Sequence, residues 1–192
     1  MAVYTIARYP RTVELRDGTS VVLRPMTAGD TGALAQFFLR VPEDDRFFLK
    51  EDVTSPKVLQ RWADELDYDR ALPLLALKDG DVIADVVLLR HRGGSRSHMA
   101  EIRPVIAPEY RGKGLGVIMM RDLIEIACDA ELNQVVFEFV KDVQDDAIEA
   151  AKFLGAFVVA EVPEMAVDMH GRPHDVVYLR LPLGKWWEWS QF

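Results

Sequence analysis

Residues 106–116 read IAPEYRGKGLG, and this stretch decides how the rest of the chain is interpreted. It follows an apolar, strand-like run over 99–106 and precedes a run over 115–130 with apolar residues at helical spacing. A glycine-rich turn from a strand into a helix leaves backbone N–H groups unpaired at the positive end of the helix dipole. We therefore predict an anion-binding site here, most often one for phosphate.

The side chains of this turn fit an anion site. Gly112, Gly114 and Gly116 let the backbone approach a ligand without an intervening Cβ atom. Arg111 and Lys113 add positive charge to a chain whose net charge is -8. The spacing differs from the Walker pattern and from the dinucleotide fingerprint, whose third glycine is replaced by a valine here. The alternative interpretation is a helix start that needs glycines only for close packing.

The composition narrows the class of protein. A chain of 192 residues, 49% hydrophobic and 28% charged, fits one globular domain. The acidic balance disfavours nucleic-acid binding, which depends on clustered Lys and Arg. No apolar run approaches the ~18 residues of a membrane span, and residues 1–16 do not resemble a signal peptide. We expect a cytoplasmic protein with no nucleic-acid or membrane partner.

Cys128 is the only cysteine, so an intramolecular disulfide is impossible and a cysteine-based metal site is disfavoured. We expect no metal, and we expect Cys128 to be a small core residue of the helix that contains it.

Turn signals and hydrophobic periodicity predict the remaining elements. A tight Asp17-Gly18 turn predicts a hairpin over 12–24, and residues 40–54 are charged and irregular. Helices are predicted after Thr27, from Ser55-Pro56, and over 115–130 and 145–154. Further strands are predicted over 74–77, 82–90, 99–106, 134–140, 157–161 and 176–181.

The motif Arg-Gly-x-Gly-x-Gly, preceded by apolar-x-Pro-x-x, resembles the acyl-CoA pyrophosphate loop of the GNAT acetyltransferase superfamily. The order of elements over about 12–182 is also similar to that family, although only 99–130 carry specific motifs. The Asp17-Gly18 hairpin followed by Leu23-Arg24-Pro25 resembles the bacterial protein lysine acetyltransferases in particular.

The resemblance implies a fold. It is an α/β fold of the GNAT type, with a central, mostly antiparallel mixed sheet, one splayed strand pair and helices on both faces. It implies a single domain over 1–192, with a Trp-rich tail over 183–192.

The resemblance also implies acetyl-CoA as cosubstrate and assigns residues to it. Val105 and Ile106 match the positions that contact the pantetheine arm in the splayed strand. The pyrophosphate loop corresponds to Arg111, Gly112, Lys113, Gly114, Leu115 and Gly116. Backbone N–H groups do most of that work, so Leu115 counts as much as the glycines. Gln144 stands where the family's last helix carries an asparagine.

Glu101 is the candidate general base, because several GNAT enzymes place a glutamate early on this strand. Alternation puts Glu101, Arg103 and Val105 on one face of the strand. The alternative is a solvent-facing glutamate paired with Arg103. Ala151 occupies the position at which the family usually carries a tyrosine that serves as general acid, so proton delivery to the leaving thiolate must come from elsewhere.

The predicted function is acetyl transfer from acetyl-CoA to a primary amine by direct attack on the thioester. The acceptor is a protein lysine, a protein N-terminus or a small amine. A homodimer is the candidate assembly, and the oligomeric state stays open. Acidic residues over 44–52 either suit a cationic acceptor or form a solvated loop. Two other functions stay open: an inactive acyl-CoA sensor, and an interaction protein that works through its Trp-rich tail.

Overall fold

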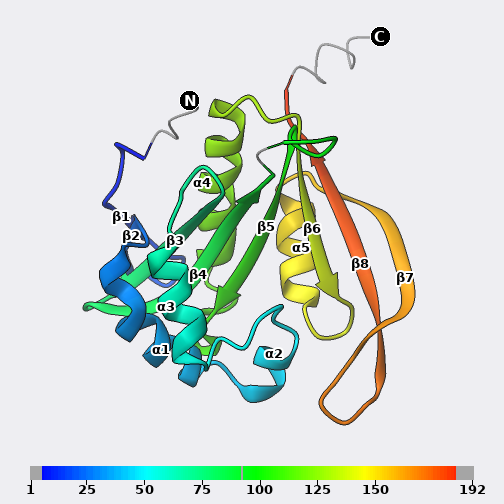
Figure 1. The fold of residues 1–192 in the computed structure, drawn as a ribbon, viewed down its shortest axis with the longest axis horizontal. Coiled ribbons are helices and arrows are strands. Elements are labelled where there is room, and N and C mark those ends of the chain that lie inside the picture. Colours follow the sequence, from blue (N-terminus) through cyan, green and yellow to red (C-terminus); the bar gives the residue numbers. More distant parts are fainter. Residues whose placement is uncertain (1–5, 92, 185–192) are drawn as a thin grey trace.

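A computed structural model describes residues 6–91 and 93–184, and its framework is one eight-stranded sheet (Figure 1). The strand order is β1-β2-β3-β4-β5-β6-β8-β7. Every neighbouring pair is antiparallel except β5 and β6, which are parallel. The strands are β1 (Arg11–Glu14), β2 (Ser20–Pro25), β3 (Ala71–Lys78), β4 (Asp81–Arg90), β5 (Met99–Ile106), β6 (Gln134–Val140), β7 (Phe157–Val167) and β8 (Pro173–Pro182).

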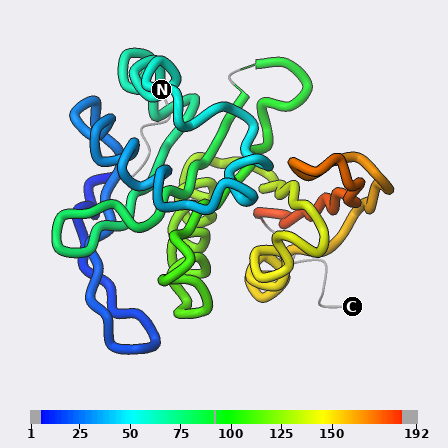
Figure 2. The backbone as a smooth tube through the Cα atoms, turned by 90° about the horizontal axis from the view of Figure 1, so that it is seen from below, coloured from blue at the N-terminus to red at the C-terminus, as the bar shows by residue number. Residues whose placement is uncertain are grey.

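The helices cover both faces of the sheet, as the sequence predicts. The α-helices are α1 (Thr31–Arg40), α2 (Glu43–Phe47), α3 (Pro56–Asp64), α4 (Leu115–Asp129) and α5 (Asp145–Phe153). Two short 3-10 turns, η1 (Ala28–Asp30) and η2 (Pro108–Tyr110), precede α1 and α4. Figure 2 shows α4 and α5 on one side of the sheet and α3 on the other.

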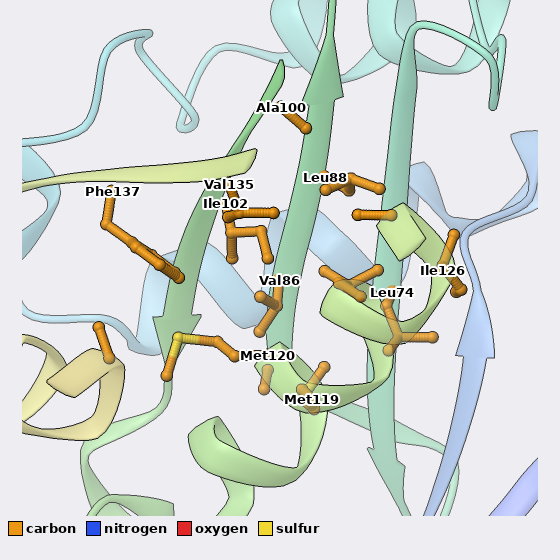
Figure 3. Close-up of a cluster of buried hydrophobic side chains, with 14 of the residues drawn as sticks. Leu74, Val86, Leu88, Ala100, Ile102, Met119, Met120, Ile126, Val135 and Phe137 are labelled. Carbon is orange, nitrogen blue, oxygen red and sulfur yellow. The ribbon is translucent and has the colours of Figure 1, made fainter. Parts of the chain in front are cut away.

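Two hydrophobic clusters hold these layers together. Leu74, Val86, Ile102 and Phe137 of the sheet pack against Met119 and other residues of α4 (Figure 3). On the opposite face, Leu75 packs with Phe37 and Phe38 of α1 and with Leu59 of α3. Adjacent residues of β3 therefore enter different clusters, because successive side chains of a strand point to opposite faces. Burial on both faces explains why β3 and β4 read as almost continuous apolar runs.

The parallel pair β5 and β6 separates after three residue pairs. Met99, Ala100 and Glu101 lie opposite Gln134, Val135 and Val136, and no later pair forms between these two strands. β4 continues to pair with β5 as far as Ile106. The two strands consequently diverge toward their carboxyl ends, as Figure 1 shows, and β5 keeps a partner on one side only. This is the predicted splayed pair.

The structure departs from the sequence predictions in three places. The region predicted as irregular contains the short helix α2, and β3, β7 and β8 extend beyond the predicted strand ends. Cys128 is exposed, so its prediction as a core residue is wrong; the buried face of α4 passes through Ile126 and Ala127 instead. The three tryptophans of the predicted tail lie outside the described residues. No helix in the described ranges is long and apolar enough to span a membrane.

Candidate active site

The glycine-rich loop links β5 to α4 with two residues in the left-handed backbone region. Gly112 has φ 70° and Gly114 has φ 89°, and Gly114 is the N-cap residue of α4. Other residues are strained in this region, so these two positions need glycine for the backbone itself. The N–H groups of the first turn of α4 have no intrahelical acceptor. The loop thus presents free donors at the positive end of a 15-residue helix.

The third glycine is not required in the same way. Gly116 has no positive φ, and an added Cβ would make only an ordinary contact, 3.9 Å from the Ile106 side chain. At Gly114 a Cβ would meet the Arg16 side chain at 3.4 Å. The loop is also held from the side, since the Arg16 N–H donates to the Lys113 carbonyl (3.1 Å). The alternative of glycines for packing alone therefore does not account for Gly112 and Gly114, whose backbone conformation favours glycine.

A cleft of about 620 Å³ opens beside this loop. Its walls come from the end of β5, the glycine-rich loop, the start of α5 and the segment around α2. Seven residues predicted to bind the cofactor line it: Val105, Ile106, Arg111, Gly112, Gly114, Gly116 and Gln144. The structure thus brings together, around one cavity, residues from positions 105 to 144.

Two predicted cofactor residues do not line the cleft with their side chains. The Leu115 side chain is fully buried in the core under α4, so only its backbone is available at the loop. The Lys113 ammonium lies 3.0 Å from Asp17 Oδ2 and 5.3 Å from the centre of the Tyr110 ring. Lys113 therefore ties the loop to the β1–β2 turn in this structure.

Arg111 and Gln144 line the cleft but also have partners within the protein. The Arg111 guanidinium donates to the Ile106 carbonyl (3.0 Å) and to Asp45 of α2 (2.6 Å). This contact fastens α2 to the glycine-rich loop. Gln144 Oε1 accepts a hydrogen bond from the Val140 N–H (2.8 Å), which closes the turn between β6 and α5.

The acidic residues over 44–52 divide into two groups. Asp45 lines the cleft, where it pairs with Arg111. Glu51 accepts hydrogen bonds from Arg61 and Trp62 of α3, both at 2.6 Å, and Asp52 accepts from Thr54. Glu51 and Asp52 therefore hold the segment in place.

Glu101 lies near the start of β5, at the end away from the glycine-rich loop. It is on the face of the sheet that α1 and α3 cover. Its two carboxylate oxygens accept hydrogen bonds from Arg103 at 2.7 and 2.8 Å, so the pairing considered as the structural alternative is present. The Lys50 ammonium lies 4.0 Å from Glu101 and 2.7 Å from Glu138 of β6. Glu101 is thus one member of a cluster of two carboxylates and two cations that bridges the diverging strands.

This four-residue cluster, Lys50, Glu101, Arg103 and Glu138, was only partly accessible to sequence reasoning. Alternation on β5 placed Glu101 beside Arg103. Glu138 joins them because Val136, two residues earlier, lies opposite Glu101 in the parallel register. Lys50 joins them through the path of the chain after α2, which carries no local sequence signal.

The position of the missing family tyrosine is filled by Ala151, whose side chain is fully buried on α5. Tyr110 of η2 is the tyrosine found among the described residues that line the cleft. Acidic side chains that the sequence analysis did not single out, including Asp142, Asp145 and Glu149, form the wall beside α5. Within the described ranges, no cluster of three or more His, Cys, Asp or Glu side chains is arranged to hold a metal ion.

Similarity to known proteins identifies the family of this chain. A sequence profile of the Acetyltransferase (GNAT) family matches residues 36–156, which is more than half of the chain. The chain therefore belongs to the GNAT acetyltransferase family. Recognition of the family from its glycine-rich loop is confirmed, and so is the predicted fold class.

Three related proteins indicate how far the similarity extends. An acetyltransferase of Pseudomonas aeruginosa is 32% identical over 120 residues, which cover 59% of this chain and 62% of that protein. A phosphinothricin acetyltransferase of Sinorhizobium meliloti, solved with acetyl-CoA, has a TM-score of 0.72 at 19% identity. It covers 85% of this chain, and 89% of its own chain is aligned.

A ribosomal-protein-S5-alanine acetyltransferase of Vibrio fischeri has a TM-score of 0.76 at 14% identity. The alignment covers 92% of this chain and 98% of that one. At these identities the two solved structures establish a shared fold. Their names denote different acceptors on that fold, so the fold does not select the acceptor.

Proposed function

We propose that this protein is an N-acetyltransferase that transfers the acetyl group of acetyl-CoA to a primary amine. One observation carries the proposal. The strand pair β5–β6 opens toward a glycine-rich loop whose free backbone donors start a long helix, and a cleft lined by the end of β5 lies beside that loop. This arrangement offers an anion site at one end and an unpaired strand edge along its length.

The pyrophosphate of acetyl-CoA is assigned to the loop, where the N–H groups from Gly112 to Gly116 are available as donors. Arg16, which lines the cleft, adds a positive charge near the loop. The α5 wall is acidic and would repel phosphate, which favours binding on the loop side of the cleft.

The pantetheine arm is assigned to the exposed edge of β5. Beyond Glu101 this strand pairs with β4 alone, so its backbone groups that face β6 lack a partner among the described strands. A pantetheine amide can pair with such groups as an added strand would. Val105 and Ile106, which line the cleft, would contact this arm.

The acceptor is proposed to be an amine that reaches the α1–α3 face of the strand gap. The ammonium of Lys50 lies there, 2.7 Å from Glu138 and 4.0 Å from Glu101, which supports this position as one for a cationic amine. Glu101 would accept a proton from the acceptor, directly or through a water molecule, and the neutral amine would attack the thioester carbonyl. The thioester supplies the activated acyl group, so the protein mainly orients the reactants.

Calorimetric titration with acetyl-CoA tests the cosubstrate site. Gly114→Glu places a carboxylate at the proposed pyrophosphate position and should abolish binding. Gly80→Glu is the matched control, because Gly80 has a similar φ of 94° but lies in the β3–β4 turn. If the folded wild-type protein fails to bind acetyl-CoA at millimolar concentration, the proposal is wrong.

The absence of a hydroxyl at Ala151 supports a second candidate, a binding protein that senses acyl-CoA without turnover. Glu101→Gln separates the two. An enzyme should lose turnover by on the order of a hundredfold or more while keeping its affinity for acetyl-CoA. A sensor would bind acetyl-CoA and acetylate no amine, whichever residue stands at this position.

A further inference from the structure

We propose that Lys50 is a self-acetylation site, acetylated by the acetyl-CoA bound in the protein's own cleft. This inference rests on the proposed function and extends it to a residue of the chain itself. It follows from where the Lys50 amine lies, how it is held there and which carboxylates surround it.

The Lys50 amine lies at the opening of the strand gap. Glu101 is the last residue of β5 that pairs with β6, where it lies opposite Val136. Glu138 lies two residues beyond Val136 on β6. Because Lys50 Nζ is 4.0 Å from Glu101 and 2.7 Å from Glu138, the amine bridges the two strands where they begin to part. The thioester of a pantetheine arm inserted between these strands would arrive at the same gap.

The backbone that carries Lys50 is held on two sides. Arg111 of the glycine-rich loop binds Asp45 in α2 at 2.6 Å. The Phe48 ring packs edge-on against His174 of β8, with ring centres 5.7 Å apart. Leu49, the residue before Lys50, lines the cleft. Holding an amine close to a bound thioester converts a bimolecular reaction into an intramolecular one, which raises its rate strongly.

The chemistry balances with the groups in place. The Lys50 ammonium gives one proton to Glu101, and the neutral amine attacks the thioester carbonyl carbon. A C–N bond forms, the C–S bond breaks, and the second amine proton is taken by the departing thiolate to give free CoA. The proton on Glu101 then passes to solvent. No oxidant, metal or further reactant is needed.

Lys152 provides an internal comparison. The side chains of Lys50 and Lys152 are both 44% exposed, and Lys152 lies 2.8 Å from Glu149, its neighbour on α5. The two amines thus match in exposure and in having a glutamate partner. They differ in that only Lys50 also lies beside Glu101. Purely chemical acetylation by acetyl-CoA should therefore modify both lysines at similar rates, whereas catalysis in the cleft should favour Lys50.

The test incubates the full chain with acetyl-CoA and follows acetylation of each lysine by peptide mass spectrometry. We expect Lys50 to react on the order of a hundredfold faster than Lys152 and to reach one acetyl group per chain. The rate should not depend on protein concentration, because the reaction is intramolecular. In Glu101→Gln and in Gly114→Glu, the rate at Lys50 should fall to that at Lys152.

Acetyl-CoA binding and acetylation of a panel of external amines are measured on the same preparation. Equal rates at Lys50 and Lys152 in a protein that acetylates an external amine overturn the inference and leave the proposed function standing. Failure to bind acetyl-CoA overturns both. Preferential Lys50 acetylation that persists unchanged in Glu101→Gln also overturns it, because the amine would then be reactive without the proposed base.

Discussion

Asp85 should make the stability of this protein depend on pH in a direction opposite to that of most carboxylates. It lies on β4 between Leu75 of β3 and Val105 of β5, in the cluster under α1 and α3. Its side chain is buried, with only 3% of the residue exposed, and no hydrogen-bond partner for its Oδ1 is found among the described residues. Burial raises the pKa of the Asp85 carboxyl from 3.8 to about 7.

The magnitude follows from this shift. A rise of roughly three pKa units corresponds to about 4 kcal/mol. The native protein retains a proton that the unfolded chain releases above its own pKa of 3.8, so stability falls as the pH rises from there to about 7. Asp85→Asn removes this titration. The buried amide still lacks partners, which costs about 1–3 kcal/mol at every pH.

The variant should therefore be more stable than wild type at about pH 8, by roughly 1–3 kcal/mol, and equally or less stable at about pH 4.5. Urea unfolding at both pH values measures the difference in unfolding free energy between wild type and Asp85→Asn. All other groups titrate alike in the two proteins, so they do not contribute to this difference. Asp81→Asn, at the exposed start of the same strand, controls for the change in net charge. If Asp85→Asn shifts stability by the same amount at both pH values, Asp85 is not a buried acid with a raised pKa and the reasoning is refuted.

Two further predictions concern helix α1, which covers the same face of the sheet as Asp85, and the turn that precedes this helix. Phe37→Ala should lower the free energy of unfolding by about 3–5 kcal/mol in urea titrations, since Phe37 is fully buried in α1; a loss under about 1 kcal/mol would contradict the packing described. Asp30→Asn should cost about 1–3 kcal/mol at neutral pH, because Asp30 accepts two hydrogen bonds from Arg24 and one from the Thr27 backbone N–H. Arg24 lowers the pKa of Asp30 to about 2, so this cost should shrink as the pH falls through 3.8 toward 2. A difference in unfolding free energy between wild type and Asp30→Asn that stays constant over this pH range would argue against the ion pair.

Two strands at the centre of the sheet, β5 and β6, could be predicted from sequence with their observed ends. Residues 99–106 and 134–140 are β5 and β6 without change, because each is an apolar run closed by a proline, glycine or charged turn. Helix α2 could not be predicted in this way. Its sequence EDDRF offers no apolar stripe, and its stability comes from acidic residues in its first turn and from the bond between Asp45 and Arg111. The second of these is a tertiary contact.

The same distinction applies to the site. The glycine-rich loop is a local feature, since the positive φ values of Gly112 and Gly114 are requirements of the backbone at those positions. The cluster around Glu101 depends on strand register and on the path of a distant loop. Glu138 reads as an ordinary alternating polar residue of β6, and Lys50 as one of many surface charges. Neither residue can be assigned to the cluster until the parallel register of β5 and β6, and the point at which their pairing ends, are known.

That separation connects the fold to the proposed chemistry. The proposed anion site follows one end of β5 and the candidate base lies near the other. Five residue steps separate Glu101 from Ile106, or about 17 Å of extended strand. A donor bound by its pyrophosphate at the loop must carry its thioester back along this strand to reach the base. It can do so only if β6 leaves the strand edge free, and the pairing of β5 with β6 ends at Glu101. In the proposed mechanism, donor, base and acceptor amine would therefore meet at the point where the pairing of β5 with β6 ends.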